Sequence, residues 1–388
     1  MKIVADANIV DVSALYEAHG ELTLLPGREI GPDDVRDADA LLVRSITKVN
    51  AGLLEGSKVR FVATATSGTD HIDLEYLREA RIAVADAAGS NANAVVEYVL
   101  ASMAQLVLAN DLDLKDKHVA IIGFGHVGRR LYESLSKLNI PCVLCDPFVA
   151  AQNSKERFCS LDEALRAPII TLHTPFSKEG PHPTFHMLDA QRLSKLAPGT
   201  VLINAARGEI VDNAALTRQL ARDSGLITVL DCWEEEPSIS ADLLRLVRIG
   251  TPHIAGYSVE AKRSASERNY QSFLQHFQLP DVRGTEGPHP TQSLLVLPNT
   301  SATNSQKLLA KVLSEACDVL AIDAQLRAGQ ANSDAALFDA IRKQISQRRE
   351  FAHYALDLDA WQPEQKKPAL LAQLRALGFG VKGFDSPA

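Results

Sequence analysis

The sequence lacks an excess of positive charge and any long apolar run, and each shortage excludes a class of protein. Its 388 residues include 40 Lys and Arg against 48 Asp and Glu, which gives a net charge of −8. Such a balance argues against a surface that coats nucleic acid. No stretch reaches the roughly 18–20 apolar residues of a membrane span. We therefore expect no nucleic-acid partner and no membrane anchor. Because Met1–Asp6 has strand character and no signal-peptide core, we expect a cytoplasmic protein.

Cysteine is also scarce. The five cysteines are an odd number and lack the spacing of a disulfide framework, which is consistent with a reducing compartment. Cys142 and Cys145 have the spacing of a redox or zinc pair, but both fall on a predicted strand, and no second Cys or His pair completes a metal site. We expect them to be buried as small apolar residues and predict no metal centre.

Three glycines after a short apolar run form the most informative motif. The run at 119–122 is typical of a buried parallel strand, and apolar residues then recur at helical spacing. Gly123 would form the tight turn, Gly125 would let a pyrophosphate approach the backbone, and Gly128 would let the helix pack closely on the strand. The helix N-terminus would hold the anion. The motif therefore predicts a dinucleotide-binding turn.

An acidic residue after the next predicted strand indicates which dinucleotide binds. Asp146 lies eighteen residues past Gly128 and closes the apolar run at 140–145. A carboxylate at this place accepts hydrogen bonds from the ribose hydroxyls and repels the 2′-phosphate of NADP. The following Pro147 and Phe148 offer no arginine for such a phosphate. NAD is therefore the predicted cofactor.

Short apolar runs alternate with helical patterns over the first 250 residues, which predicts an α/β fold. Strands are expected at 3–5, 22–25, 40–43, 61–65, 82–85, 119–122, 140–145, 169–172, 201–204, 228–230 and 247–250, and helices at 93–107, 259–277, 306–328 and 334–349. We expect two doubly wound Rossmann-like lobes, a split substrate domain and a central NAD domain, plus a smaller C-terminal α/β dimerisation domain. The domains would be a substrate-binding lobe at 1–93 completed by 257–280, an NAD-binding domain at 94–256, and a C-terminal domain at 286–388 after a Pro/Gly-rich boundary at 280–290.

Three ionisable residues follow predicted strands of the NAD-binding domain: Arg207, Glu236 and His253. In an open parallel sheet, ligands bind beyond the carboxyl ends of the strands. A guanidinium can grip a substrate carboxylate, and an imidazole can take a hydroxyl proton as hydride leaves. A carboxylate beside the imidazole would hold its tautomer and raise its pKa. Each residue alone could be an ordinary loop residue, but together, after a nucleotide motif, they predict a hydroxy-acid dehydrogenase.

Several segments resemble the D-2-hydroxyacid dehydrogenase family over roughly residues 1–280. They are Leu172-His173-Thr174-Pro175, Leu196–Gly208, Asp231–Pro237 and Thr251-Pro252-His253. The resemblance implies that Arg207, Glu236 and His253 are catalytic. It also implies that the cofactor is bound by Gly123, Gly125, His126, Val127, Gly128, Asp146, Thr174, Ala205, Ala206, Arg207, Asp231 and Gly256. The seventeen residues from Glu236 to His253 are fewer than the family usually has, which indicates a shortened loop.

Some of these assignments have alternatives. Asp231 could cap a strand end instead of contacting the cofactor, and we expect structural or peripheral roles for His173 and His186. In the C-terminal segment, Arg342, Arg348 and Arg349 could meet a phosphate, but a solvated helix face is the expectation.

Within the family, three features resemble members that oxidise a phosphorylated four-carbon sugar acid. They are the insert at 177–186, the run at 63–73 and the extra C-terminal segment. The resemblance implies substrate contacts from Ser45, Thr66 and Tyr257 and a homodimer. Two alternatives stay open: a dehydrogenase of 3-phosphoglycerate or of another D-2-hydroxy acid, and an NADH-sensing binding protein of the corepressor type.

Overall fold

The computed structural model describes residues 1–152, 156–283, 293–295, 304–330, 335–345, 347–358, 361 and 367–382. The chain forms two compact units. Unit 1 consists of residues 1–91 with the segment that starts at Ser258, and unit 2 consists of residues 92–257 with the described C-terminal residues. The predicted Pro/Gly-rich boundary lies outside the described residues from position 284 onward, as does the predicted start of the C-terminal domain.

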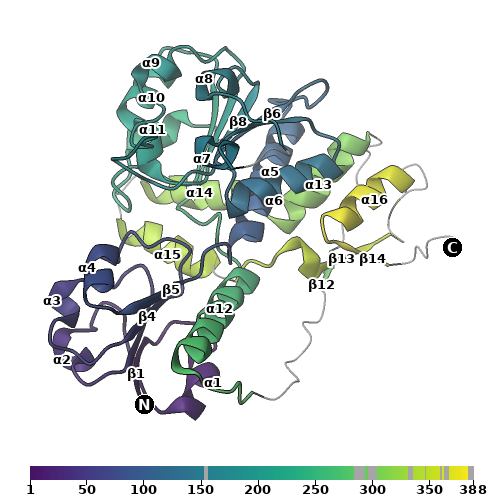
Figure 1. The fold of residues 1–388 in the computed structure, drawn as a ribbon. Helices are drawn as coiled ribbons and strands as arrows, with labels where there is room; N and C mark the ends of the chain where they lie inside the picture. The colour runs from purple at the N-terminus through teal and green to yellow at the C-terminus, as the bar shows by residue number, and fades with distance from the viewer. Residues whose placement is uncertain are drawn as a thin grey trace. The chain divides into compact units, whose positions relative to one another are not determined.

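Unit 1 is built on a five-stranded parallel sheet in the order β2-β1-β3-β4-β5 (Figure 1). Its strands are β1 Lys2–Asp6, β2 Glu21–Leu25, β3 Ala40–Val43, β4 Phe61–Thr64 and β5 Ala83–Asp86, and its helices are α1 Val12–Tyr16, η1 Glu17–His19, α2 Pro32–Val35, α3 Ala51–Leu54, α4 Leu74–Glu79 and α12 Val259–Phe277. Side chains alternate between the two faces of each strand, so each face has its own core. Tyr270 and Phe273 of α12 pack on the face that carries Ile3 and Ala63, while Val62 lies in the other core. A helix about 170 residues away in the sequence thus completes the N-terminal sheet.

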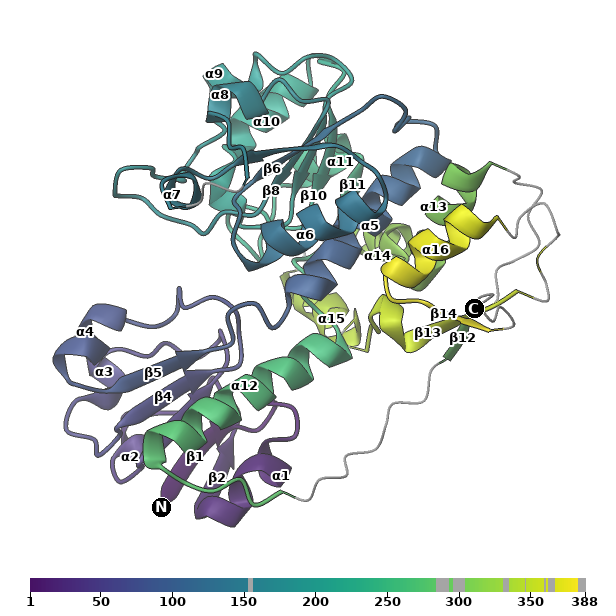
Figure 2. The same ribbon diagram turned by 45° about the vertical axis from the view of Figure 1, so that its right-hand side comes forward.

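Unit 2 contains a six-stranded parallel sheet in the order β11-β10-β9-β8-β6-β7. Its strands are β6 Val119–Ile122, β7 Cys142–Cys145, β8 Ile169–Leu172, β9 Val201–Asn204, β10 Ile227–Leu230 and β11 Ile249–Gly250. Its helices up to β11 are α5 Ala92–Leu108, α6 His126–Lys137, α7 Pro147–Ala150, α8 Leu161–Ala164, α9 Ala190–Leu193, η2 Gly208–Ile210, α10 Asn213–Leu220 and α11 Ala241–Leu246. Helices α9 and α10 cover one face of the sheet, and α5 and α6 cover the other (Figure 2). The strand order reverses between β6 and β8, and such a switch point is where doubly wound sheets bind ligands.

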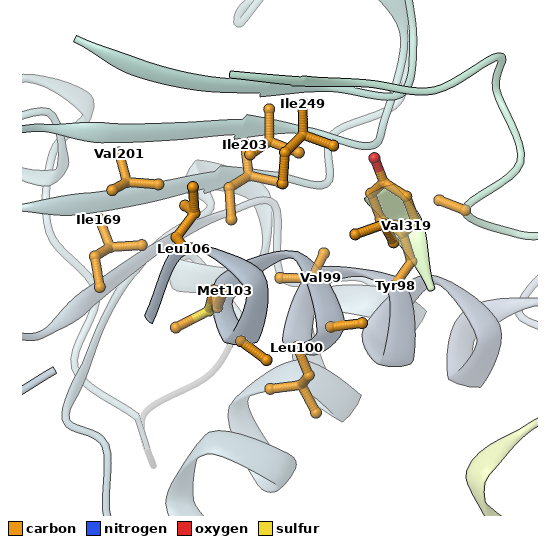
Figure 3. Packing of buried hydrophobic residues seen from close by; sticks show 14 of the residues in the cluster. Tyr98, Val99, Leu100, Met103, Leu106, Ile169, Val201, Ile203, Ile249 and Val319 are labelled. Carbon is orange, nitrogen blue, oxygen red and sulfur yellow. The ribbon is translucent and has the colours of Figure 1, made fainter. Parts of the chain in front are cut away.

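Helix α5 lies against the sheet of unit 2 with almost every side chain buried. Figure 3 shows Met103 and Leu106 of this helix facing Ile169, Val201 and Ile203 of the sheet. Burial of this kind contributes about 1.5–3 kcal/mol for each large aliphatic side chain. The α/β class predicted from the sequence is confirmed.

The C-terminal residues belong to unit 2 and form a three-stranded parallel sheet in the order β12-β13-β14 with several helices. The elements are β12 Ser293–Leu295, α13 Ser305–Ala316, α14 Val319–Gln330, α15 Ala335–Ile345, η3 Phe351–His353, β13 Tyr354–Asp357, α16 Pro368–Ala376 and β14 Gly380–Lys382. The prediction of one continuous helix at 306–328 was wrong, because α13 ends before Cys317 and a second helix, α14, follows. Among the described residues, none of the helices is both long and apolar enough to cross a membrane.

Candidate active site

The glycine turn after β6 is tightly packed at two positions and open at the third. Gly123 has a φ of +95°, and a Cβ there would lie 2.6 Å from the carbonyl carbon of His173. A Cβ on Gly128 would lie 2.0 Å from the carbonyl oxygen of Gly123. At Gly125, by contrast, a Cβ would meet no described atom within 4 Å. Two glycines thus let strand, loop and helix approach one another, and the third leaves the turn accessible.

The start of α6 fits the pyrophosphate of a dinucleotide. Gly125 is the N-cap residue and provides no side-chain cap, so the first amides of the helix, from His126 and Val127, point at an open turn. Beside the turn, Thr174 Oγ1 is buried and has no hydrogen-bond partner in the described part of the chain. A buried hydroxyl without a partner needs an acceptor or donor from a ligand. These residues therefore fit NAD, as does the order of the strands.

Asp146 is held at the carboxyl end of β7 by backbone amides. Its Oδ2 accepts from Phe124 N at 2.8 Å, and its Oδ1 accepts from Phe148 N and Val149 N at 3.1 and 3.0 Å. These bonds fix the carboxylate beside the glycine turn, and Oδ2, which accepts one bond, keeps lone-pair capacity. The contact with the ribose stays a prediction.

His253 and Glu236 form a hydrogen-bonded pair. His253 Nδ1 and Glu236 Oε2 are 2.7 Å apart, and Glu236 Oε1 accepts from Trp233 N at 2.8 Å. The imidazole is 32% exposed and the carboxylate 21% exposed. With Nδ1–H donated to the carboxylate, Nε2 is the nitrogen that can exchange a proton with a substrate.

Burial and charge act in opposite directions on this pair. Burial lowers the pKa of His253, but interactions with Cys232 and Glu236 outweigh it, and the pKa is raised well above its ordinary value. Burial raises the pKa of Glu236, but His253, Trp233 N and the charge of Arg342 outweigh that, and the pKa is lowered. The carboxylate is therefore ionised beside an imidazole that holds its proton more firmly than a free histidine.

Asp231 fixes the loop that carries His253. The side chain is fully buried, and its oxygens accept from Ile254 N at 2.8 Å and Ala255 N at 2.9 Å. Thr251 Oγ1 donates to the same carboxylate at 2.6 Å. Burial raises the pKa of Asp231 above its ordinary range, against the effect of these hydrogen bonds. The structural alternative for Asp231 thus has direct support, and a contact with the cofactor stays a prediction.

The loop of Arg207 is held by a residue that sequence reasoning missed. Asn204, fully buried at the end of β9, donates to Arg207 O at 2.8 Å and accepts from Ala206 N at 3.2 Å. A Cβ on Gly208 would lie 2.0 Å from the carbonyl carbon of Trp233, so the arginine loop packs directly on the loop of Glu236. The three predicted catalytic residues therefore lie on neighbouring loops at one edge of the sheet.

The C-terminal segment braces the histidine loop, which no local pattern indicated. Gly250 N donates to Asp323 at 2.7 Å, and Arg348 donates to Ala255 O at 3.0 Å. Arg342 donates to Tyr257 OH at 2.7 Å. The expectation that Arg342 lies on a solvated helix face was wrong, because its side chain is only 25% exposed. Gly256 lies between these two anchored positions.

His173 and His186, for which structural or peripheral roles are expected, are both hydrogen-bonded within the chain. His173 is bonded to Thr171 Oγ1 at 2.9 Å, and burial lowers its pKa to about 3. His186 pairs with Glu234 at 2.6 Å and stacks on Phe185. Within the described part of the chain, two groups of side chains have possible ligand atoms within 4.8 Å of one another, as a metal ion would require: Cys232, Glu236 and His253, and His186, Asp212 and Glu234. In both groups a histidine is already bonded to a carboxylate.

In unit 1, the predicted substrate residues lie on loops that follow strands. Ser45 is exposed after β3, next to Arg44, which pairs with the buried Asp6 at 2.8 Å. Thr66 follows β4 and shares a hydrogen bond with Thr64 at 2.7 Å. Their contact with substrate stays a prediction.

Comparison with known proteins gives a consistent result. Residues 100–255 match the model of the D-isomer specific 2-hydroxyacid dehydrogenase, NAD binding domain. The chain is 45% identical to the erythronate-4-phosphate dehydrogenase of Chromohalobacter salexigens, over 98% of this chain and 99% of that protein. It is 42% identical to the same enzyme of Saccharophagus degradans, over 98% and 99%.

Solved structures agree with this result. The NAD-bound 3-phosphoglycerate dehydrogenase of Entamoeba histolytica has a TM-score of 0.61 and 25% identity, over 72% of this chain and 95% of that chain. NAD as the cofactor is therefore confirmed at the level of the family. The chain belongs to the erythronate-4-phosphate dehydrogenase family, within the D-isomer-specific 2-hydroxyacid dehydrogenases.

Proposed function

We propose that this protein oxidises 4-phospho-D-erythronate to (R)-3-hydroxy-2-oxo-4-phosphobutanoate, in the biosynthesis of pyridoxal 5′-phosphate. NAD, when bound, accepts the hydride that leaves C2 of the substrate. The C2 hydroxyl gives its proton to His253 Nε2, and C2 loses its hydrogen as the hydride. The C2 alcohol thereby becomes a ketone. The product is the 2-oxo acid.

The side chains of unit 2 supply the other steps. Glu236 accepts the hydrogen bond of His253 Nδ1, which orients the ring and stabilises the imidazolium that forms. Arg207 is proposed to bind the substrate carboxylate through its guanidinium, as a planar fork of N–H donors does. Tyr257 is proposed to contact the substrate near the histidine. Ser45 and Thr66 are proposed as further substrate contacts.

The hydrogen bond of His253 to Glu236 is the single observation that carries this proposal. It supports His253 as a proton acceptor with a fixed tautomer. The histidine lies in unit 2, which contains the match to the NAD-binding family model, and the loop of its partner Glu236 packs on the arginine loop. A dinucleotide-binding protein without chemistry needs no such pair, whereas oxidation of an alcohol needs a base.

Turnover of the named substrate tests the proposal. The purified full-length protein would be incubated with NAD and 4-phospho-D-erythronate, and both NADH and the 2-oxo acid would be measured, because NADH that stays bound would hide turnover. We expect oxo-acid formation. Turnover of 3-phosphoglycerate or another D-2-hydroxy acid in its place would contradict the specific substrate and leave the reaction class intact.

Two finer properties belong to this proposal. We expect the enzyme to be a cytoplasmic homodimer, with the C-terminal residues contributing to dimerisation. Light scattering of the full-length chain would show twice the mass of 42.0 kDa. A monomer at assay concentration would contradict the dimer without affecting the catalytic assignment.

A further inference from the structure

Arg342 brings a partly buried cation from the C-terminal segment to the catalytic loop. It lies on α15 (Figure 1), and its Nη2 donates to Tyr257 OH at 2.7 Å. The guanidinium carbon is 5.4 Å from the centroid of the Tyr257 ring and 5.8 Å from that of Phe338. Tyr257 follows His253 by four residues, so the cation is tied to the loop of the catalytic base.

The charge of Arg342 also reaches the catalytic pair itself. Besides the larger effects of His253 and Trp233 N, Arg342 contributes to the lowered pKa of Glu236. Coulombic effects between groups in a protein fall off with distance and solvent exposure. The positive charge of Arg342 therefore acts on the carboxylate that pairs with His253, from a side chain that is hydrogen-bonded to Tyr257.

Among the described residues, Arg342 is acted on by the negative charges of Glu236 and Asp339, and its ion pair is with Asp339. Its ion pair with Asp339 is long, at 3.4 Å, and that carboxylate is 49% exposed. Its Nε is buried and has no hydrogen-bond partner among the described residues. Arg327, also in the C-terminal segment, is different, because it pairs with Asp323 at 2.7 Å and donates to two backbone carbonyls. Arg348 likewise donates to Ala94 O and Ala255 O.

Burying part of a guanidinium is costly unless a strong acceptor compensates for the lost water. The phosphate of a substrate is such an acceptor, since its oxygens match the fork of guanidinium N–H groups. Tyr257 OH already orients Nη2, so little side-chain freedom is lost when an anion binds.

We propose that Arg342 binds the phosphate group of the substrate and thereby sets the preference for phosphorylated over unphosphorylated hydroxy acids. This inference rests on the proposed function, because it assumes a phosphorylated substrate. It gives the C-terminal segment a role in specificity besides its bracing of the histidine loop.

Kinetics of the full-length protein with two substrates test this role. The wild type, Arg342→Gln, Arg342→Lys and Lys343→Gln would be assayed with 4-phospho-D-erythronate and with D-erythronate at saturating NAD. Lys343 is exposed on the same helix, so its variant controls for the loss of one positive charge. For Arg342→Gln we expect kcat/KM for the phosphorylated acid to fall about 10–100-fold, mainly through KM, and the preference over D-erythronate to fall by the same factor. Lys should restore part of the preference.

Several outcomes would overturn the inference. An equal loss with both substrates would mean that Arg342 only supports the fold, and no loss would mean that it has no part in binding. If D-erythronate is turned over too slowly to measure, competition by inorganic phosphate against the substrate provides the second readout. That competition should weaken in Arg342→Gln and persist in Lys343→Gln, and equal competition would also overturn the inference. Failure of the proposed function is seen separately, as absence of turnover in the wild type.

Discussion

Glu236 Oε2 and His253 Nδ1 are 2.7 Å apart, so the protonation of one side chain depends on the charge of the other. Burial lowers the pKa of His253, but Cys232 and Glu236 raise it by more, so the pKa is above its ordinary value. Oxidation needs Nε2 without its proton, so kcat/KM for oxidation should rise with pH through this raised pKa, above the ordinary value of about 6.5. The reverse reduction should weaken over the same pH range.

Replacement of the carboxylate should move this pH dependence. In Glu236→Gln the negative charge is lost, so the pKa of His253 should fall and the acidic limb of the oxidation profile should move to lower pH. We expect kcat at its optimum to fall on the order of 10–100-fold. Glu235→Gln changes an exposed neighbour and serves as the control. If the acidic limb of the pH profile does not move in Glu236→Gln, the carboxylate does not set the pKa of His253.

Removal of the imidazole separates an enzyme from a sensor of NADH. In His253→Ala we expect turnover to fall by about 10²–10⁴-fold, because the proton acceptor is gone. NADH affinity, followed by nicotinamide fluorescence, should change little, because the glycine turn is untouched. Retained turnover would exclude His253 as the base, whereas absence of turnover in the wild type, with NADH affinity intact, would favour the binding-protein alternative.

The glycine turn predicts opposite effects for two similar substitutions. Gly128→Ala places a Cβ 2.0 Å from Gly123 O, so helix and strand must separate, and we expect a loss of stability of about 1–3 kcal/mol or more and a lower Tm. Gly125→Ala meets no atom within 4 Å. Its Tm should stay near that of the wild type while NAD affinity falls, because the methyl occupies the approach of the pyrophosphate. Unchanged NAD affinity in a folded Gly125→Ala would argue against this binding place.

Replacement of the buried Asp231 by asparagine should lower both stability and activity. In the wild type, two backbone N–H groups donate to the two carboxylate oxygens of Asp231. In Asp231→Asn an NH₂ group replaces one of these oxygens and faces a donor. An unsatisfied buried donor costs about 1–3 kcal/mol. We expect a Tm lower by several degrees and a lower kcat, because His253 depends on this loop. The exposed Asp242→Asn is the control; equal behaviour of the two variants would rule out the positioning role.

Three of the cysteines should be unreactive in the folded protein. Cys145 and Cys232 are buried; Cys142 was predicted to be buried as well but is only half-buried. Burial raises the pKa of Cys142 and of Cys145 to about 12, and that of Cys232 to about 11. Because the thiolate is the reacting form, iodoacetamide at pH 8 should label these thiols only after denaturation. Rapid labelling of Cys142 or Cys145 in the native state would revive the redox interpretation.

Much of the fold was predictable because its strands are short, apolar and bounded by polar turns. The predicted strands at 40–43, 119–122, 169–172 and 201–204 coincide with β3, β6, β8 and β9, each a run of four buried residues. Strand β12 has only three residues and lies about 60 residues from its partner β13, so its own sequence carries no comparable signal. The break at Cys317 was missed for a similar reason, since apolar residues continue on both sides of it.

The candidate site was predictable where residues follow strands of one sheet. Strand ends bring Arg207, Glu236 and His253 to one edge, and the spacing of the glycines shows the turn. Contacts from the C-terminal segment were not predictable, because Arg342 and Tyr257 are 85 residues apart in the sequence. Helical periodicity marks which face of α15 is apolar, but it does not show that an arginine on that helix reaches a tyrosine elsewhere.

The packing of α12 on the first sheet has a consequence for folding during synthesis. During synthesis, the face of that sheet which carries Ile3 and Ala63 has no cover until Tyr270 and Phe273 leave the ribosome. At about 5–20 residues per second, the intervening residues take roughly 10–30 s to translate. The first sheet to be made therefore waits for a helix that is translated after β11, the last strand of the six-stranded sheet, so that second sheet can form before the first is covered.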